Sequence, residues 1–66
     1  MKITINGQEK EFTSSVNLKK VIEQFCKDSQ HVIAEVNGTI IKSQVWPEKN
    51  LSNGDTVELV NFVGGG

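Results

Sequence analysis

The chain has 66 residues, of which 23% are charged and 36% hydrophobic, and a formal net charge of −1. This length allows one domain, near the lower limit for a core without disulfides, and leaves no room for an enclosed active site. The seven basic residues are all lysines scattered along the chain, so no basic stripe predicts binding to nucleic acid. No apolar stretch approaches a membrane span or a signal peptide, so we expect no membrane partner.

The chain contains one cysteine, Cys26, and one histidine, His31. A single cysteine excludes an internal disulfide, and a reducing cytoplasm is the expected location. No metal-ligand set and no pair of nucleophile and base can be assembled, so we expect neither a bound metal or cofactor nor an enzyme. Cys26 is interpreted as a small filler at the margin of the core, and His31 as part of a solvated loop.

A β-hairpin is predicted at the N-terminus. Residues 2–5 alternate polar and apolar side chains, and Asn6-Gly7 follows them. This dipeptide is typical of a type I′ turn, because both of its central residues need a positive φ. The second strand is expected over residues 8–13, with Phe12 facing the core.

The hydrophobic period changes after the hairpin to that of a helix, predicted from Leu18 to about Lys27. Asn17 is a candidate N-cap, and Val16 before it can pack against Val21 in the first turns. One apolar stripe predicts that the helix packs on one sheet. The stripe has the spacing i, i+3, i+4 and i+7, and consists of Leu18, Val21, Ile22 and Phe25.

A second hairpin follows, with a strand over residues 31–36, an Asn37-Gly38 turn and a short return strand over residues 39–41. One turn of helix is expected over residues 43–46, closed by Pro47, because proline disfavours helical geometry in the residue before it. Ser43 is the possible cap of this turn. Trp46 is interpreted as a partly buried lid over the core.

Leu51 is expected to anchor the next loop, and Asn53-Gly54-Asp55 to turn the chain into a last strand over residues 56–62. Together the elements predict an α+β fold: a mixed sheet with one main helix packed on one face, and the first and last strands parallel at its centre. This is the β-grasp, or ubiquitin-like, arrangement.

The last strand carries large apolar groups on both faces. Val57 and Leu59 alternate with Val60 and Phe62. If the first pair faces the helix, the second pair projects from the open face, where Val60, Phe62 and the adjacent Val63 would form a docking surface for a partner. The alternative is that a central strand is buried on both sides, or that Phe62 folds over a sheet edge.

The sequence ends in three glycines, Gly64, Gly65 and Gly66. Glycine loses the most backbone freedom on ordering, so we interpret residues 1–63 as the domain and residues 64–66 as a flexible tail. A tail without side chains can enter a narrow channel of a partner, where it presents the α-carboxylate of Gly66. With Val63 it reaches roughly 13 Å when extended. A chance accumulation of small residues at a chain end, or a linker scar, is the alternative.

The chain resembles the ThiS family, the ubiquitin-like sulfur carriers of thiamine biosynthesis. The resemblance covers the whole chain, and the ending 62–66 (FVGGG) is its most specific part. The other residues that carry it are the Asn6-Gly7 hairpin, the amphipathic helix, Val36-Asn37-Gly38 and the Asn53-Gly54-Asp55 turn. The family's paired terminal glycines correspond to Gly65 and Gly66, with Gly64 as an added spacer.

The resemblance implies a carrier that partner enzymes modify at Gly66. An E1-like adenylyltransferase of the ThiF type would use ATP to adenylate the terminal carboxylate. A cysteine-derived sulfur donor would then convert it into a thiocarboxylate, which donates sulfur to a thiazole synthase of the ThiG type. The carrier is expected to be a monomer on its own. Alternatives are a sulfur carrier for molybdopterin or tRNA thiolation, and a non-covalent ubiquitin-like interaction module.

Overall fold

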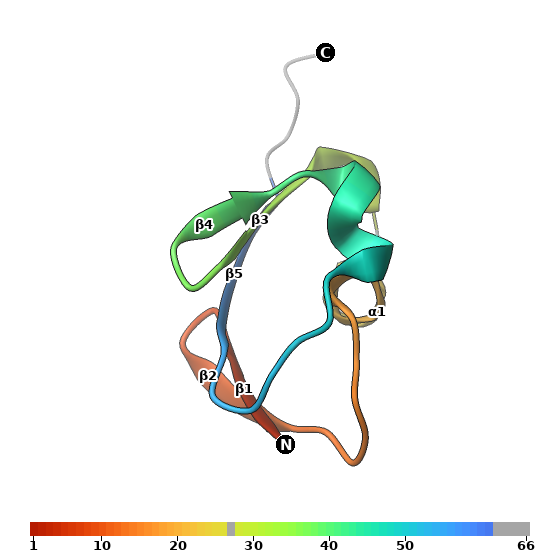
Figure 1. The fold of residues 1–66 in the computed structure, drawn as a ribbon. Coiled ribbons are helices and arrows are strands. Elements are labelled where there is room, and N and C mark those ends of the chain that lie inside the picture. Colours follow the sequence, from red (N-terminus) through yellow and green to blue (C-terminus); the bar gives the residue numbers. More distant parts are fainter. Residues whose placement is uncertain (27, 62–66) are drawn as a thin grey trace.

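The computed structural model describes residues 1–26 and 28–61 of the chain. One five-stranded sheet has the order β2-β1-β5-β3-β4 (Figure 1). The strands are β1 (Lys2–Ile5), β2 (Gln8–Glu11), β3 (Val32–Val36), β4 (Thr39–Ile41) and β5 (Thr56–Asn61). The helix α1 (Leu18–Phe25) and two 3₁₀ helices, η1 (Ser29–His31) and η2 (Ser43–Glu48), complete the fold. This is the predicted α+β, β-grasp architecture.

The last strand of the described chain lies at the centre of the sheet. β5 pairs in parallel with β1 through two residue pairs, Thr4 with Thr56 and Ile5 with Val57. On its other side it pairs antiparallel with β3 along nearly its whole length. Figure 1 shows β5 between the hairpin β1–β2 and the hairpin β3–β4. The predicted parallel pairing of the first and last strands is confirmed.

Both Asn-Gly turns have the predicted backbone. Asn6 and Gly7 have φ values of 50° and 82°, and Asn37 and Gly38 have 52° and 85°. Asparagine and glycine tolerate this left-handed region, which is why the dipeptide directs a tight hairpin. The second strand of the first hairpin ends at Glu11, two residues earlier than predicted. Phe12 lies just beyond it, and still packs against the core.

Helix α1 begins as predicted and ends earlier. The Asn17 side chain accepts a hydrogen bond from the backbone N–H of Lys20 at 2.8 Å, which caps the first turn. The helix ends at Phe25, and Cys26 is its C-cap in an extended conformation. The predicted continuation of the helix past Phe25 was therefore wrong at Cys26, and Lys27 lies outside the described residues.

Phe25 does not belong to the buried stripe that the helical spacing predicts. Leu18, Val21 and Ile22 have no exposed surface, whereas Phe25 is 44% exposed. The physical reason is the polar side chain it meets: β2 places Lys10 there, with its ammonium group 5.7 Å from the centre of the phenyl ring. Contact with a cation leaves the ring at the surface.

The segment after β4 also differs from the prediction. η2 runs through Pro47 to Glu48 and is a 3₁₀ helix, and Lys42 rather than Ser43 is at its N-cap, without a side-chain hydrogen bond. Pro47 fits inside because a 3₁₀ helix this short requires few backbone N–H donors. Similarly, the strand expected from His31 begins at Val32, because His31 ends η1.

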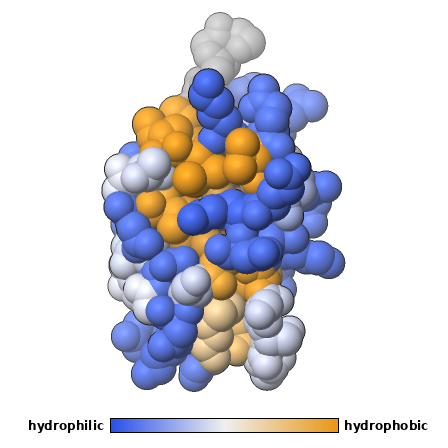
Figure 2. All heavy atoms as spheres, viewed as in Figure 1, coloured by the Kyte–Doolittle hydropathy of each residue, from blue (hydrophilic) through white to orange (hydrophobic). Residues whose placement is uncertain are grey.

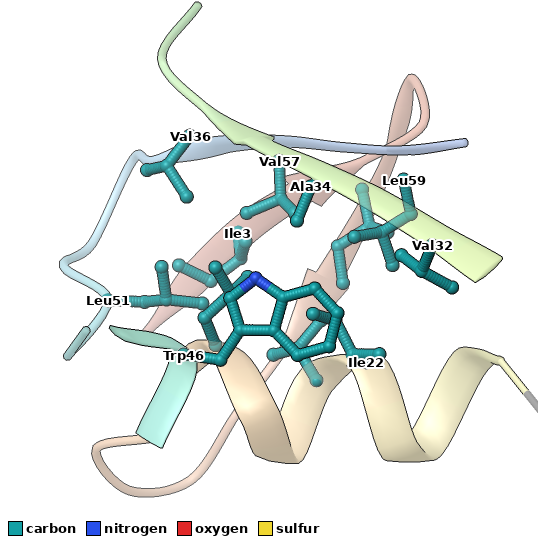
Figure 3. Close-up of a cluster of buried hydrophobic side chains, with 12 residues drawn as sticks. Ile3, Ile22, Val32, Ala34, Val36, Trp46, Leu51, Val57 and Leu59 are labelled. Atoms are coloured by element: carbon teal, nitrogen blue, oxygen red, sulfur yellow. The ribbon is translucent and has the colours of Figure 1, made fainter. Parts of the chain in front are cut away.

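The core lies between the sheet, α1 and η2. Trp46 is 6% exposed, so it is a core residue and not a partly buried lid, and its indole Nε1 donates to the carbonyl of Ile41 at 2.9 Å. Figure 3 shows the indole among the side chains of the sheet and of α1. The predicted anchor Leu51 is buried as well. The sheet supplies Ile3, Ile5, Val32, Ala34, Val36, Val57 and Leu59.

Candidate functional site

The two faces of β5 have different surroundings. Val57 and Leu59 are buried against the helix side of the sheet, with 0% and 8% exposure. Val60 points to the other face and is 53% exposed. The condition under which Val60 projects from the open face is therefore met. The predicted docking residues Phe62 and Val63, and the tail residues Gly64, Gly65 and Gly66, lie outside the described residues.

Two further apolar side chains share this surface, and the sequence interpretation did not include them. Ile33 on β3 pairs directly with Val60 and is 41% exposed, and Ile40 on β4 is 63% exposed. Ile33 alternates with the buried Val32 and Ala34, so its position on the open face could have been read from the strand period. We call Ile33, Ile40 and Val60 the open-face patch.

Two carboxylates lie beside the patch. Glu35 of β3 pairs with Glu58 of β5, and Glu35 also pairs with Ile40 of β4. Each glutamate alternates with buried neighbours, which places both on the open face. Like charges directly opposite one another in a sheet are destabilising. The open face therefore combines apolar and acidic side chains.

Side chains from the two hairpin turns hold β5 in place. The Asn6 amide donates to the carbonyl of Leu59 at 3.2 Å and accepts from the N–H of Leu59 at 2.8 Å. At the other end of the strand, the carbonyl oxygen of the Asn37 side chain accepts from the N–H of Thr56 at 2.9 Å. Val60 of the open-face patch thus lies on a strand that is anchored near both ends.

Asp55 links the Asn37 turn to the loop before β5. Its carboxylate accepts from the N–H of Ser52 at 2.8 Å and from the Asn37 amide at 3.0 Å. Burial opposes the charged form, but the hydrogen bonds from Ser52 and Asn37 and the charge of Lys49 together outweigh it, and the pKa of Asp55 is lowered. The ionised carboxylate therefore fixes the entry into β5.

A groove of about 380 Å³ opens between β3, β4 and η2, and its walls include Val32, Ile41 and Trp46. Ile33 and Ile40 line it as well, so it is continuous with the open-face patch around the β4 edge. Figure 2 shows apolar surface gathered on this side of the molecule, with polar side chains at its margins and across its middle.

Cys26 and His31 are not part of the open-face patch. Cys26 is half-buried against the core, and burial raises the pKa of its thiol. The His31 ring lies 3.0 Å from the carboxylate of Asp28, and this contact lowers the pKa of Asp28. His31 is in η1 rather than in the loop expected for it. In the described part of the chain, no group of three or more His, Cys, Asp or Glu side chains is placed to hold a metal ion.

Neither α1 nor a 3₁₀ segment within residues 1–26 and 28–61 has the length and apolarity needed to cross a membrane. The described residues form a β-grasp domain with β5 at the centre of its sheet. In the sequence, β5 is followed within three residues by Gly64, Gly65 and Gly66.

The model of the ThiS family matches residues 3–66, and the chain belongs to the ThiS family. The fold is similar to the crystal structure of the thiamine biosynthesis protein ThiS from Geobacter metallireducens, with a TM-score of 0.85, 26% identity and full coverage of both chains. A solution structure of a thiamine biosynthesis protein from the same organism gives a TM-score of 0.80, with 26% identity, over all of this chain and 88% of that one.

Two further relatives are similar in sequence. The chain is 33% identical over its whole length to a segment of a thiazole synthase from Paramagnetospirillum magneticum, and spans 20% of the length of that protein. It is 37% identical to the uncharacterized protein ycf40 of Trieres chinensis, over 94% of this chain and 85% of that protein.

Proposed function

We propose that the protein is a sulfur carrier of thiamine biosynthesis, and a cosubstrate of partner enzymes rather than an enzyme. The observation that carries the proposal is the extent of the ThiS family match, which covers residues 3–66 and so includes the three glycines that end the sequence. The reacting group is the α-carboxylate of Gly66, and the partners supply the catalytic groups.

The chemistry takes place in two steps at this carboxylate. A ThiF-type, E1-like enzyme catalyses its attack on the α-phosphorus of ATP, which forms an acyl-adenylate and releases pyrophosphate. A cysteine-derived sulfur atom, brought to the oxidation level of sulfide by a thiol reductant, then displaces AMP and leaves a thiocarboxylate. Adenylation is needed because a carboxylate is a poor electrophile. The thiocarboxylate that results is a stronger nucleophile than the carboxylate it replaces.

The tail residues Gly64 and Gly65 carry Gly66 into the partner's channel, and the domain provides the docking surface. Val60 on the anchored strand β5 is exposed, which supports a role with Phe62 and Val63 in docking. A ThiG-type thiazole synthase receives the sulfur. The thiazole synthase of P. magneticum contains a segment related to this whole chain, which supports that pairing.

The test is incubation of the carrier with a ThiF-type enzyme, ATP, a cysteine desulfurase, cysteine and a thiol reductant, followed by intact-mass spectrometry. We expect a mass increase equal to the exchange of one oxygen for sulfur. A variant lacking Gly66 should show none while keeping its circular dichroism spectrum, because the tail contributes little to the core. An unchanged wild-type mass, with enzymes that charge a known carrier, would favour a non-covalent interaction module.

A second step assigns the pathway. The charged carrier is incubated separately with a ThiG-type thiazole synthase, a molybdopterin synthase large subunit and a tRNA thiolation enzyme, each with its cosubstrates. We expect the sulfur to be lost with the thiazole synthase alone. Loss with either other enzyme would reassign the carrier to that pathway.

A further inference from the structure

The open face of the sheet is uncovered among the described residues, and its exposed groups are of two kinds. The open-face patch (Ile33, Ile40 and Val60) is apolar, with exposures of 41%, 63% and 53%. Glu35 and Glu58 lie directly beside it, opposite one another on β3 and β5. Like charges in register destabilise a sheet, and apolar side chains gathered on an exposed face are typical of an interaction surface.

Within the described chain, no ion pair or side-chain hydrogen bond compensates Glu35 or Glu58. By contrast, Glu23 on α1 has Lys19 as a partner at 3.8 Å. Two adjacent carboxylates without a cation form a site that a guanidinium or ammonium group would complete, because a planar guanidinium can donate to two carboxylates at once.

We propose that the open face is a docking surface for a protein partner that presents an apolar patch rimmed by arginine or lysine, with one of these cations between Glu35 and Glu58. The choice of partner enzymes for its test rests on the proposed function. The apolar groups exclude water around the charged contact, which strengthens it, and the carboxylates select the partner.

The charges decide between possible occupants. A second copy of this chain would bring Glu35 and Glu58 against the same two carboxylates in a symmetric contact, and the four negative charges would repel. The carboxylates repel an anionic surface for the same reason. A cationic rim on a different protein is the complementary choice. The surface includes Glu58 and Val60 of β5, so docking there also positions the strand that precedes Gly66 in the sequence.

The charged half of the surface is tested with the double variant Glu35→Gln/Glu58→Gln. Its affinities for a ThiF-type enzyme and for a ThiG-type thiazole synthase are measured separately by titration calorimetry. We expect the affinity for at least one of them to fall about tenfold at low ionic strength, and the difference to shrink near 1 M salt, where the Debye length is ~3 Å. The matched control, Glu23→Gln/Glu48→Gln, removes the same charge from α1 and η2 and should change neither affinity.

Stability distinguishes docking from a structural role. Removal of the repulsion between Glu35 and Glu58 should raise the thermal midpoint of the double variant while its binding weakens. For the apolar half, Ile40→Ser should weaken binding severalfold, whereas Val45→Ser, at an exposed residue of η2, should not.

Wild-type affinity for both enzymes in the double variant, or an equal loss in its control, would overturn the docking proposal and leave the sulfur-carrier function standing if the wild type is charged at Gly66. A wild-type chain that binds neither enzyme and gains no sulfur would overturn both.

Discussion

The side chain of Asn6 pairs with the main chain of Leu59 as if it were another residue of strand β1. Its amide donates to the Leu59 carbonyl at 3.2 Å and accepts from the Leu59 N–H at 2.8 Å. The backbone pairs between β1 and β5 end at Ile5 and Val57, so Asn6 extends the attachment by two positions along β5. A turn residue thereby supports the strand that leads to the C-terminus.

Replacement of Asn6 by glycine should destabilise the protein by about 1–2 kcal/mol, because two hydrogen bonds to β5 are lost while the positive φ remains allowed. Asn6→Asp keeps the acceptor for the Leu59 N–H but sets a carboxylate oxygen against the Leu59 carbonyl, so it should also be less stable than the wild type. Urea denaturation followed by Trp46 fluorescence measures both. Equal stability of all three proteins would show that the pairing contributes nothing.

Replacement of Trp46 by phenylalanine should cost about 1–3 kcal/mol, because the change leaves a cavity and removes the donor to the Ile41 carbonyl. Trp46→Ala should cost about 3–5 kcal/mol, enough to unfold much of a domain this small. Thermal melts by circular dichroism give both values. A loss below that of an exposed control, Val45→Ala, would contradict the assignment of Trp46 to the core.

Phe25 and Ile22 are both apolar residues of α1, and the sequence places them on one stripe. Ile22→Ala should cost about 2–5 kcal/mol, because Ile22 is fully buried. Phe25→Ala should cost about 1 kcal/mol or less, since the exposed ring loses mainly its contact with Lys10. Paired urea titrations compare them. A larger loss for Phe25 would mean that the ring belongs to the core after all.

Asp55 makes stability depend on pH in the acid range. Its pKa is lower in the folded protein, so its contribution is fully present above the ordinary aspartate value near 3.9 and is lost as pH falls through the folded pKa. Asp55→Asn should be less stable at pH 7 and lose less stability on acidification. Unfolding curves at several pH values below 5 test this. The same acid dependence in both proteins would assign it to other carboxylates, among them Asp28.

Val60→Ala and Val57→Ala make the same chemical change on the two faces of β5. Val57 is fully buried, so its truncation should cost about 1–3 kcal/mol. Val60 is 53% exposed, and its truncation should leave stability nearly unchanged while it weakens docking to the ThiF-type enzyme. Thermal melts and binding titrations are run in parallel on both variants. Normal binding by a stable Val60→Ala protein would remove Val60 from the docking surface.

Local signals in the sequence predicted much of the fold. The two Asn-Gly turns, the Asn17 cap and the strand alternation each depend on a few adjacent residues, and the structure confirms them. The exposure of Phe25 was not predictable from its own helix, because it depends on Lys10 in a strand far along the sequence. The path of η2 through Pro47 and the full burial of Trp46 depend in the same way on tertiary packing.

The candidate site was also predicted only in part, because some of its features depend on contacts between strands. The alternation in β5 indicated that Val60 is exposed once Val57 faces the helix. It could not show that Ile33 pairs with Val60, or that Glu35 pairs with Glu58, because both facts require the register between β3 and β5. Strand register is set by contacts across the sheet, and one strand's sequence does not contain it.

The place of β5 between β1 and β3 has a consequence for biosynthesis. A ribosome produces the N-terminal hairpin first, yet that hairpin meets its inner neighbour only when residues 56–61 have emerged. Nascent chains that stop before this segment lack the middle of their sheet and cannot mature. A cell would therefore expose unfinished copies to its proteases, and only molecules translated through their central strand would reach the folded state.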